Sequence, residues 1–149
     1  MAFINDNFML QSEAAQRLYD NYAKNAPIID FHNHLSPQMI AENYVPKTIT
    51  EMWLGGDHYK WRLLRANGVD EKYITGDADD YEKFEKWAQT LPYTMRNPIY
   101  HWSHLELKRY FNEDRLLTPE TCREIYDNCN AQIAAGGFGA MGMLKKMNV

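Results

Sequence analysis

The sequence predicts a mainly α-helical chain that contains a single β-strand. Apolar residues recur at helical spacing over most of the chain, and N-capping residues or prolines precede these stretches. One short run, residues 27–35, instead favours β structure and is flanked by Pro27 and Pro37. With 149 residues, 45% of them apolar and 24% charged, the chain is long enough to form one hydrophobic core.

The predicted helices follow one another along the chain, and most of them have a recognisable start. The predicted starts are Ser12, Ser36 with Pro37, Thr50, Asp57, Asn97 with Pro98, and Thr118 with Pro119. Apolar stripes at helical spacing predict which side chains are buried. The clearest stripes are formed by Tyr81, Phe84, Trp87, Ala88 and Leu91, and by Cys122, Ile125, Tyr126, Cys129 and Ile133.

The predicted strand, residues 27–35, has no second strand in this sequence with which to pair. The backbone groups of a strand bond to neighbouring strands, so one strand alone leaves its own donors and acceptors unsatisfied. Two expectations remain open: the chain is entirely helical, or the partner strands lie outside these 149 residues.

Charge and hydropathy exclude several classes of protein. The chain has 16 basic and 20 acidic residues, a net charge of −4 and no basic cluster, which argues against nucleic-acid binding. Mean hydropathy is −0.60, and every apolar stretch is shorter than the roughly 18 residues of a membrane helix. The first residues do not resemble a secretion signal. We therefore expect a cytoplasmic protein.

The two cysteines, Cys122 and Cys129, lie on one face of a predicted helix. Seven helical residues rise about 10 Å, which exceeds the roughly 7 Å limit between the Cα atoms of a disulfide. We expect reduced thiols in the core.

The pattern His32-x-His34 at the end of the predicted strand is the strongest chemical signal. Residues i and i+2 of a strand point to the same side, so both imidazoles can face one divalent metal ion. Asp30 shares that side and is a candidate to hold one ring in a fixed tautomer. Two histidines with ordinary hydrogen-bond partners are the alternative, and a catalytic zinc site needs at least one more protein ligand.

A second candidate site is the segment Gly55-Gly56-Asp57-His58-Tyr59-Lys60-Trp61-Arg62. Two glycines before a helix N-terminus allow a ligand to approach the backbone. His58, Tyr59 and Arg62 then offer an acid–base group, a phenol and a cation. The alternative is a capped helix with a buried Trp61, and the residues taken alone favour it.

A third histidine pair, His101 and His104, shares one face of a predicted helix. The glutamate of a zinc-binding H-E-x-x-H helix is missing. We expect this face to be solvated and Trp102 and Leu105 to be buried.

Several of these blocks together resemble the N-terminal region of the uronate isomerase family, also called glucuronate isomerase, of the amidohydrolase superfamily. The blocks are Pro27-Ile28-Ile29-Asp30-Phe31-His32-Asn33-His34-Leu35, the segment from Trp53 to Arg62, Arg65-Ala66-Asn67-Gly68-Val69, Arg96-Asn97-Pro98-Ile99-Tyr100-His101-Trp102 with His104-Leu105-Glu106-Leu107, and Met147-Asn148-Val149. The resemblance implies part of a metal-dependent (β/α)8 barrel. Residues 1–35 would be an N-terminal helix and the first barrel strand, and residues 36–149 a helical insertion.

The same resemblance implies an aldose–ketose isomerase of hexuronate catabolism. It interconverts D-glucuronate with D-fructuronate and D-galacturonate with D-tagaturonate. His32 and His34 match metal ligands, with zinc as the expected ion. His58 and Tyr59 match substrate-binding residues, and Tyr59 is also the expected catalytic group.

The sequence departs from the family pattern because the family's later ligands, substrate arginines and base have no counterpart before Val149. We therefore expect an incomplete, inactive N-terminal portion, whose complete form acts on a small hexuronate and is compatible with a homo-oligomer. A non-catalytic helical binding module is the alternative. Metal-dependent hydrolysis, common in the wider superfamily, fits the Gly55 to Arg62 block less well.

Overall fold

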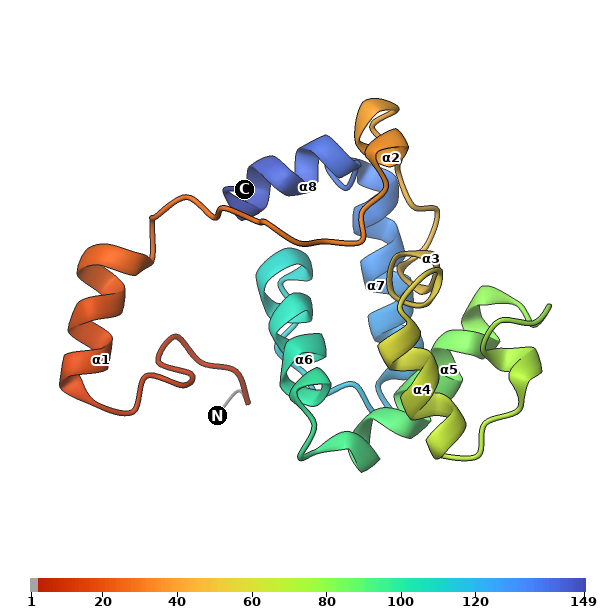
Figure 1. The fold of residues 1–149 in the computed structure, drawn as a ribbon. Helices are drawn as coiled ribbons and strands as arrows, with labels where there is room; N and C mark the ends of the chain where they lie inside the picture. The colour runs from red at the N-terminus through yellow and green to blue at the C-terminus, as the bar shows by residue number, and fades with distance from the viewer. Residues whose placement is uncertain (1–2) are drawn as a thin grey trace. The chain divides into compact units, whose positions relative to one another are not determined.

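The computed structural model describes residues 3–149, which form eight α-helices and no β-strand (Figure 1). The mainly α-helical prediction is confirmed. The chain divides into two compact units, one made of Pro46–Ala135 with residues 3–4, and one made of Asn5–Val45 with Gly136–Val149. The sequence instead predicted a division at residue 35, between a first barrel strand and a helical insertion. Residues 3–149 do not form a complete barrel, so this division stays a prediction.

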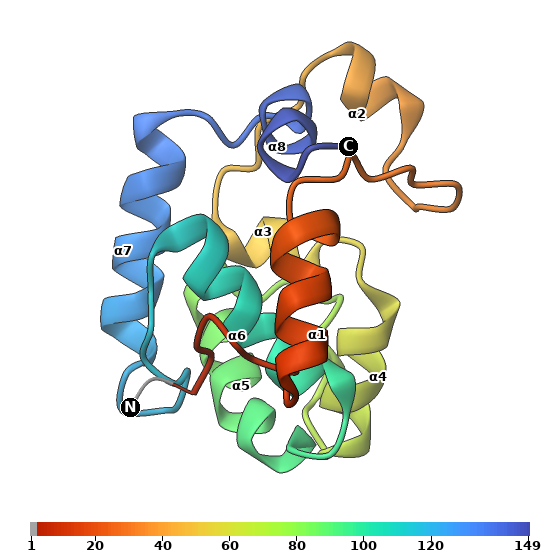
Figure 2. The same cartoon turned by 90° about the vertical axis from the view of Figure 1, so that its left-hand side faces the viewer.

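The first unit is a helical bundle around one central helix, α5. This helix packs against α3, α4 and α7, and α6 runs beside α7 (Figures 1 and 2). The helices of this unit are α3 (Ile49–Leu54), α4 (His58–Ala66), the 3-10 turn η2 (Glu71–Tyr73), α5 (Asp80–Thr90), the 3-10 turn η3 (Leu91–Thr94), α6 (Pro98–Phe111) and α7 (Cys122–Ala135).

Aromatic and aliphatic side chains of α5 form the centre of the core. Phe84 and Trp87 are fully buried, and the Phe84 ring stacks on Trp53 with 6.0 Å between ring centroids. Full burial of a large apolar side chain contributes about 2–3 kcal/mol. Cys122 and Cys129 are buried free thiols, as predicted. Burial raises their pKa to about 11 and about 12, so both thiols stay protonated at neutral pH.

The predicted helix starts are confirmed where a side chain caps the backbone. Ser12, Ser36, Asp57 and Asn97 each accept a hydrogen bond from an N–H group of the first turn. Two starts differ from the prediction. Thr48 rather than Thr50 caps α3, and α7 begins at Cys122. In that segment the Thr121 hydroxyl donates to the Leu116 carbonyl oxygen.

The predicted exposure of the third histidine pair is wrong. His104 is 4% exposed, whereas Trp102 is 52% exposed. His104 lies inside because both ring nitrogens have backbone partners: Nδ1 lies 2.7 Å from the Tyr100 carbonyl oxygen, and Nε2 accepts from the Leu117 N–H at 3.1 Å. The His104 imidazole therefore links α6 by hydrogen bonds to the segment that follows this helix.

The second unit contains α1 (Glu13–Leu18) with its π-helical continuation η1 (Tyr19–Ala23), α2 (Pro37–Ala41) and α8 (Ala140–Met147). The last of these was not predicted, because no side chain of its own N-terminus caps it. Residues far away in sequence bond to its first turn instead: the Asn43 Oδ1 atom accepts from the Met141 N–H, and the Tyr44 carbonyl oxygen accepts from the Ala140 N–H.

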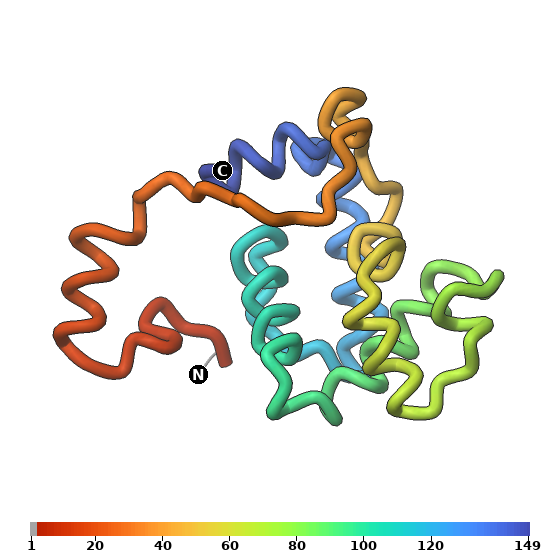
Figure 3. Tube along the Cα trace, viewed as in Figure 1, coloured from red at the N-terminus to blue at the C-terminus, as the bar shows by residue number. Residues whose placement is uncertain are grey.

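The strand predicted for residues 27–35 is absent from the described residues. The segment runs as an open trace without helical turns (Figure 3). The Ile28 N–H donates to the Asn148 carbonyl oxygen at 2.7 Å, but residues 3–149 offer no strand with which the segment can pair. Ile29 and Phe31 are 87% and 96% exposed. The strand prediction fails because a sheet needs a second strand.

None of the helices in residues 3–149 is long and apolar enough to span a membrane.

We predict that His104 makes the first unit sensitive to acid. Burial lowers the pKa of His104 below its ordinary value of 6.5, although the bond to Tyr100 partly offsets this. The unfolded chain therefore binds this proton more readily, and the stability that neutral His104 provides is lost as pH falls below about 6.5.

Chemical denaturation between pH 7.5 and pH 5.5 measures this loss. In His104→Gln, which carries no titrating group at this position, the free energy of unfolding should fall less over that range. Equal pH dependence in both proteins would contradict the assignment.

Candidate functional site

The start of α4 is built by a glycine turn and one capping carboxylate. A Cβ atom on Gly55 would lie 2.5 Å from the Glu51 carbonyl oxygen, so no larger residue fits where the chain leaves α3. The Asp57 Oδ1 atom accepts from the N–H groups of Tyr59 and Lys60 at 2.9 and 3.1 Å. The predicted capped helix is confirmed.

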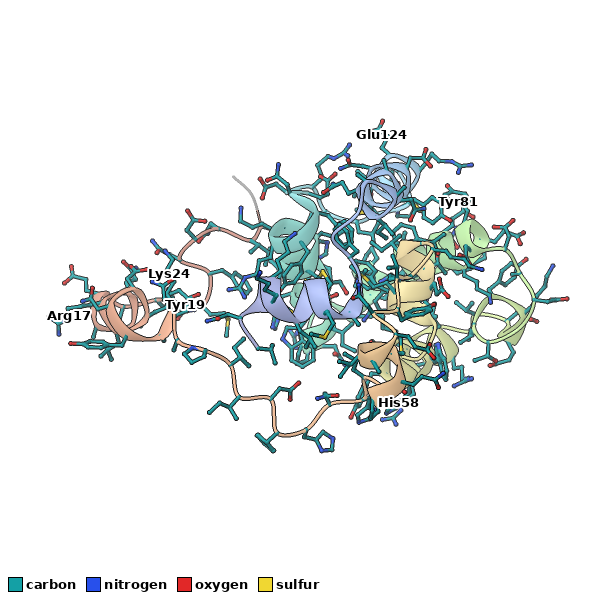
Figure 4. The ribbon with its side chains drawn as sticks, turned by 90° about the horizontal axis from the view of Figure 1, so that it is seen from above. Arg17, Tyr19, Lys24, His58, Tyr81 and Glu124 are labelled. Carbon is teal, nitrogen blue, oxygen red and sulfur yellow. The ribbon has the colours of Figure 1, made fainter. Side chains whose placement is uncertain are left out.

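His58 and Tyr59 project from this first turn and are both exposed, and His58 is labelled in Figure 4. Their ring centroids are 4.5 Å apart, and the Arg62 guanidinium lies 5.9 Å from the Tyr59 ring centroid. The imidazole, phenol and cation predicted from sequence are therefore neighbours on one surface. Trp61 is half-buried, and its indole donates to the Leu54 carbonyl oxygen at 2.7 Å.

Charged side chains beneath this surface were not predicted. Lys60 is only 7% exposed, and its ammonium bonds to Asp57 Oδ2 at 2.6 Å. Burial works against ionisation of Asp57, but the Lys60 charge and the hydrogen bonds from Lys60 and Tyr59 outweigh it and hold the pKa of Asp57 below its ordinary value. The i, i+3 spacing of Asp57 and Lys60 was the sequence signal that could have indicated this ion pair.

The carboxyl group of Glu106, on α6, also faces this cluster. Burial raises the pKa of Glu106, the Lys60 charge and a hydrogen bond from Trp53 oppose the rise, and Asp57 adds to it. The sequence did not indicate this interaction, because a glutamate between Leu105 and Leu107 is an ordinary pattern for a helix.

His32 and His34 lie in the second unit, with 5.4 Å between their ring centroids and 58° between their planes. Two imidazoles that bind one tetrahedral zinc through Zn–N bonds of about 2.0–2.1 Å have ring centres about 5 Å apart. The pair is therefore close enough to share an ion. Asp30 does not hold a ring in place: its Oδ1 atom accepts from the main-chain N–H of His32 at 3.2 Å.

Within residues 3–149 no third histidine, cysteine or carboxylate joins these two imidazoles to complete a metal-binding group. The donor set fits two ligands of a divalent metal site and lacks the third ligand that a catalytic zinc requires. His58 and Tyr59 belong to the other unit, so the chain carries two separate pairs of candidate residues.

Comparison with known proteins assigns the chain to a class of sugar isomerases. The glucuronate isomerase family profile matches residues 1–149. The chain belongs to the glucuronate isomerase family.

Individual relatives agree with this assignment. The chain is 58% identical to a uronate isomerase of Bacteroides thetaiotaomicron over 148 residues, which cover 99% of this chain and 32% of the relative. It is 57% identical to a uronate isomerase of Shouchella clausii, covering 99% of this chain and 31% of that protein. The chain thus spans about a third of the length of these relatives.

Solved structures carry the same helical arrangement. The crystal structure of uronate isomerase from Thermotoga maritima matches with a TM-score of 0.93 at 36% identity, covering 100% of this chain and 32% of that one. The glucuronate isomerase structure from Caulobacter crescentus matches with a TM-score of 0.86 at 24% identity, over 98% of this chain and 33% of that one, which supports the fold alone.

We predict weak zinc binding by the 149-residue chain. Two imidazoles alone should give a Kd of about micromolar or weaker, because tight zinc sites have three or four protein ligands. Competition with a chromogenic chelator measures the affinity, and a variant with both His32→Ala and His34→Ala should lose the binding.

The control for this titration is His101→Ala, which removes an imidazole from α6 and should leave zinc binding unchanged. Nanomolar binding that survives the loss of both His32 and His34 would refute their assignment as ligands.

Proposed function

We propose that this chain provides part of the active site of a uronate isomerase, which interconverts D-glucuronate with D-fructuronate and D-galacturonate with D-tagaturonate. The match of the whole chain to the glucuronate isomerase family carries the proposal. The complete protein would be a metal-dependent (β/α)8 barrel of the cytoplasm, and residues 36–149 its helical insertion.

His32 and His34 are the proposed metal ligands of this chain. Their separation suits a shared divalent ion, with zinc favoured by imidazole ligands. When bound, such an ion polarises a substrate oxygen and stabilises negative charge on it. The segment that carries both residues exposes Ile29 and Phe31. This exposure is expected of a barrel strand whose neighbouring strands are formed by residues outside 3–149.

His58 and Tyr59 are the proposed substrate-binding residues. Both are exposed on a first turn whose backbone Asp57 fixes. Arg62 adds a positive charge beside the Tyr59 ring, which suits the carboxylate of a hexuronate. Aldose–ketose conversion moves a proton between C1 and C2 and redistributes protons on the adjoining hydroxyls. Tyr59 would move one of these hydroxyl protons.

We predict that the 149-residue chain alone does not turn over glucuronate. It supplies two imidazoles and two substrate contacts, and loss of the remaining ligands and of the base should cost many orders of magnitude in rate. A coupled assay for fructuronate formation tests this. Turnover by the purified chain that survives His34→Ala would contradict the proposal.

A chimera allows Tyr59 to be tested in a complete protein. Residues 1–149 replace the matching segment of the Bacteroides thetaiotaomicron relative, to which they are 58% identical. In this chimera Tyr59→Phe should lower kcat by roughly 10²-fold, the usual scale for an acid–base group. His58→Ala should mainly raise KM if His58 binds ground and transition states equally.

Thermal unfolding of each variant separates lost chemistry from lost stability. Unchanged kcat in Tyr59→Phe, with an unchanged Tm, would contradict the catalytic role. An active chimera that tolerates changes at His32, His34, His58 and Tyr59 together would instead favour a non-catalytic binding module.

A further inference from the structure

The geometry points to Lys60 and Asp57 as a positioning cluster that fixes the first turn of α4 and so sets the orientation of His58 and Tyr59. The inference rests on the proposed substrate-binding role of those two residues. Neither Lys60 nor Asp57 need touch the substrate, and each acts through the backbone or through its neighbour.

Asp57 ties the turn together with both of its carboxylate oxygens. Oδ1 accepts from the backbone N–H groups of Tyr59 and Lys60, and Oδ2 accepts from the Lys60 ammonium at 2.6 Å. Asp57 is therefore bonded both to the backbone of Tyr59 and to the side chain of Lys60. A rotation of the first turn would break these bonds.

Lys60 anchors the turn to the interior of the first unit. Its side chain is almost fully buried, and the ammonium lies 5.6 Å from the centroid of the Trp53 ring on α3. Successive residues of a helix are about 100° apart, so a buried Lys60 directs Tyr59 and His58 away from the core. Both of those side chains are exposed.

Glu106 approaches this cluster from α6. Its carboxyl group feels the charges of both Lys60 and Asp57, and it accepts a hydrogen bond from Trp53. Glu106 on α6 is therefore an electrostatic neighbour of the Asp57–Lys60 pair on α4.

Stability alone does not account for a lysine at this position. An ammonium costs desolvation energy when it is buried, and apolar residues of similar volume are often as stable as a buried ion pair. The charged groups instead restrict the orientation of the first turn of α4, because short hydrogen bonds and ion pairs tolerate only a narrow range of geometries. Small displacements of reacting groups lower rates by up to about 10²-fold.

Two substitutions in the chimera separate positioning from capping. Asp57→Asn keeps an oxygen that caps the helix, since asparagine and aspartate are equally good N-caps, but it removes the charge that holds Lys60. Lys60→Met keeps an unbranched side chain and removes the ammonium. Both should lower kcat by about tenfold or more, with KM changed by less than the fall in kcat.

The matched control removes another ion pair of the same helix. Arg65 bonds to Glu71 through its Nε and one terminal nitrogen at 2.8 and 2.5 Å, on the exposed surface near the end of α4. Glu71→Gln should leave kcat and KM unchanged. Combining Asp57→Asn with Lys60→Met should cost no more than the larger single effect, because both changes break one interaction.

Tyr59→Phe in the same chimera distinguishes failure of this inference from failure of the proposed function. If Tyr59→Phe lowers kcat while Asp57→Asn and Lys60→Met change only Tm, the cluster is purely structural and the inference is overturned. If Tyr59→Phe also leaves kcat unchanged, the proposed role of the turn is wrong, and the inference falls with it. A fall in kcat in both cluster variants at an assay temperature well below their Tm supports it.

Discussion

An extended segment can be buried only if neighbouring strands satisfy its backbone hydrogen bonds, and this requirement governs how residues 27–35 are interpreted. The segment carries both candidate metal ligands, and its apolar Ile29 and Phe31 side chains are almost fully exposed. The main chain of Ile28 is bonded to Asn148, and the Asn148 side-chain amide donates to the Ala26 carbonyl oxygen. These bonds hold only the beginning of the segment. Pairing within a sheet would satisfy the rest and bury Ile29 and Phe31.

The helical unit formed mainly by Pro46–Ala135 meets this requirement differently, because helices satisfy their backbone internally. Phe84 and Trp87 are fully buried in its core. Among the buried polar atoms of residues 3–149, Trp87 Nε1 and the Ser103 hydroxyl have no hydrogen-bond partner, whereas the other buried polar side chains of this unit are paired. His104 and Lys60 are two such groups, the first bonded to backbone atoms and the second to a carboxylate. The first turn of α4 therefore presents His58 and Tyr59 from a rigid support, which suits groups that must meet a substrate in one orientation.

Local signals in the sequence predicted most of the helices, because caps such as Ser12, Asp57 and Asn97 act within a few residues of themselves. The start of α8 was missed because its bonds come from Asn43 and Tyr44, about a hundred residues earlier. The exposure of His104 was predicted wrongly for the same reason, since its partner Leu117 lies beyond the helix. The strand was predicted from composition, which records β preference but not the presence of a neighbouring strand.

The candidate site was predictable to a similar extent. Residue types and spacing indicated His32, His34, His58, Tyr59 and Arg62, and the structure places the members of each local group close together. Their roles were implied only by resemblance to the uronate isomerase family. The contact of Lys60 with Asp57 follows from helical spacing, but the approach of Glu106 depends on how α6 packs, which no local pattern specifies.

The most direct test of the central claim is a crystal structure of the chimera with zinc and a hexuronate bound. The proposal requires imidazole nitrogens of both His32 and His34 about 2.0–2.1 Å from one zinc ion, and the Tyr59 hydroxyl within about 3 Å of a sugar hydroxyl. Zinc held without these imidazoles, or a sugar bound away from Tyr59, would contradict it.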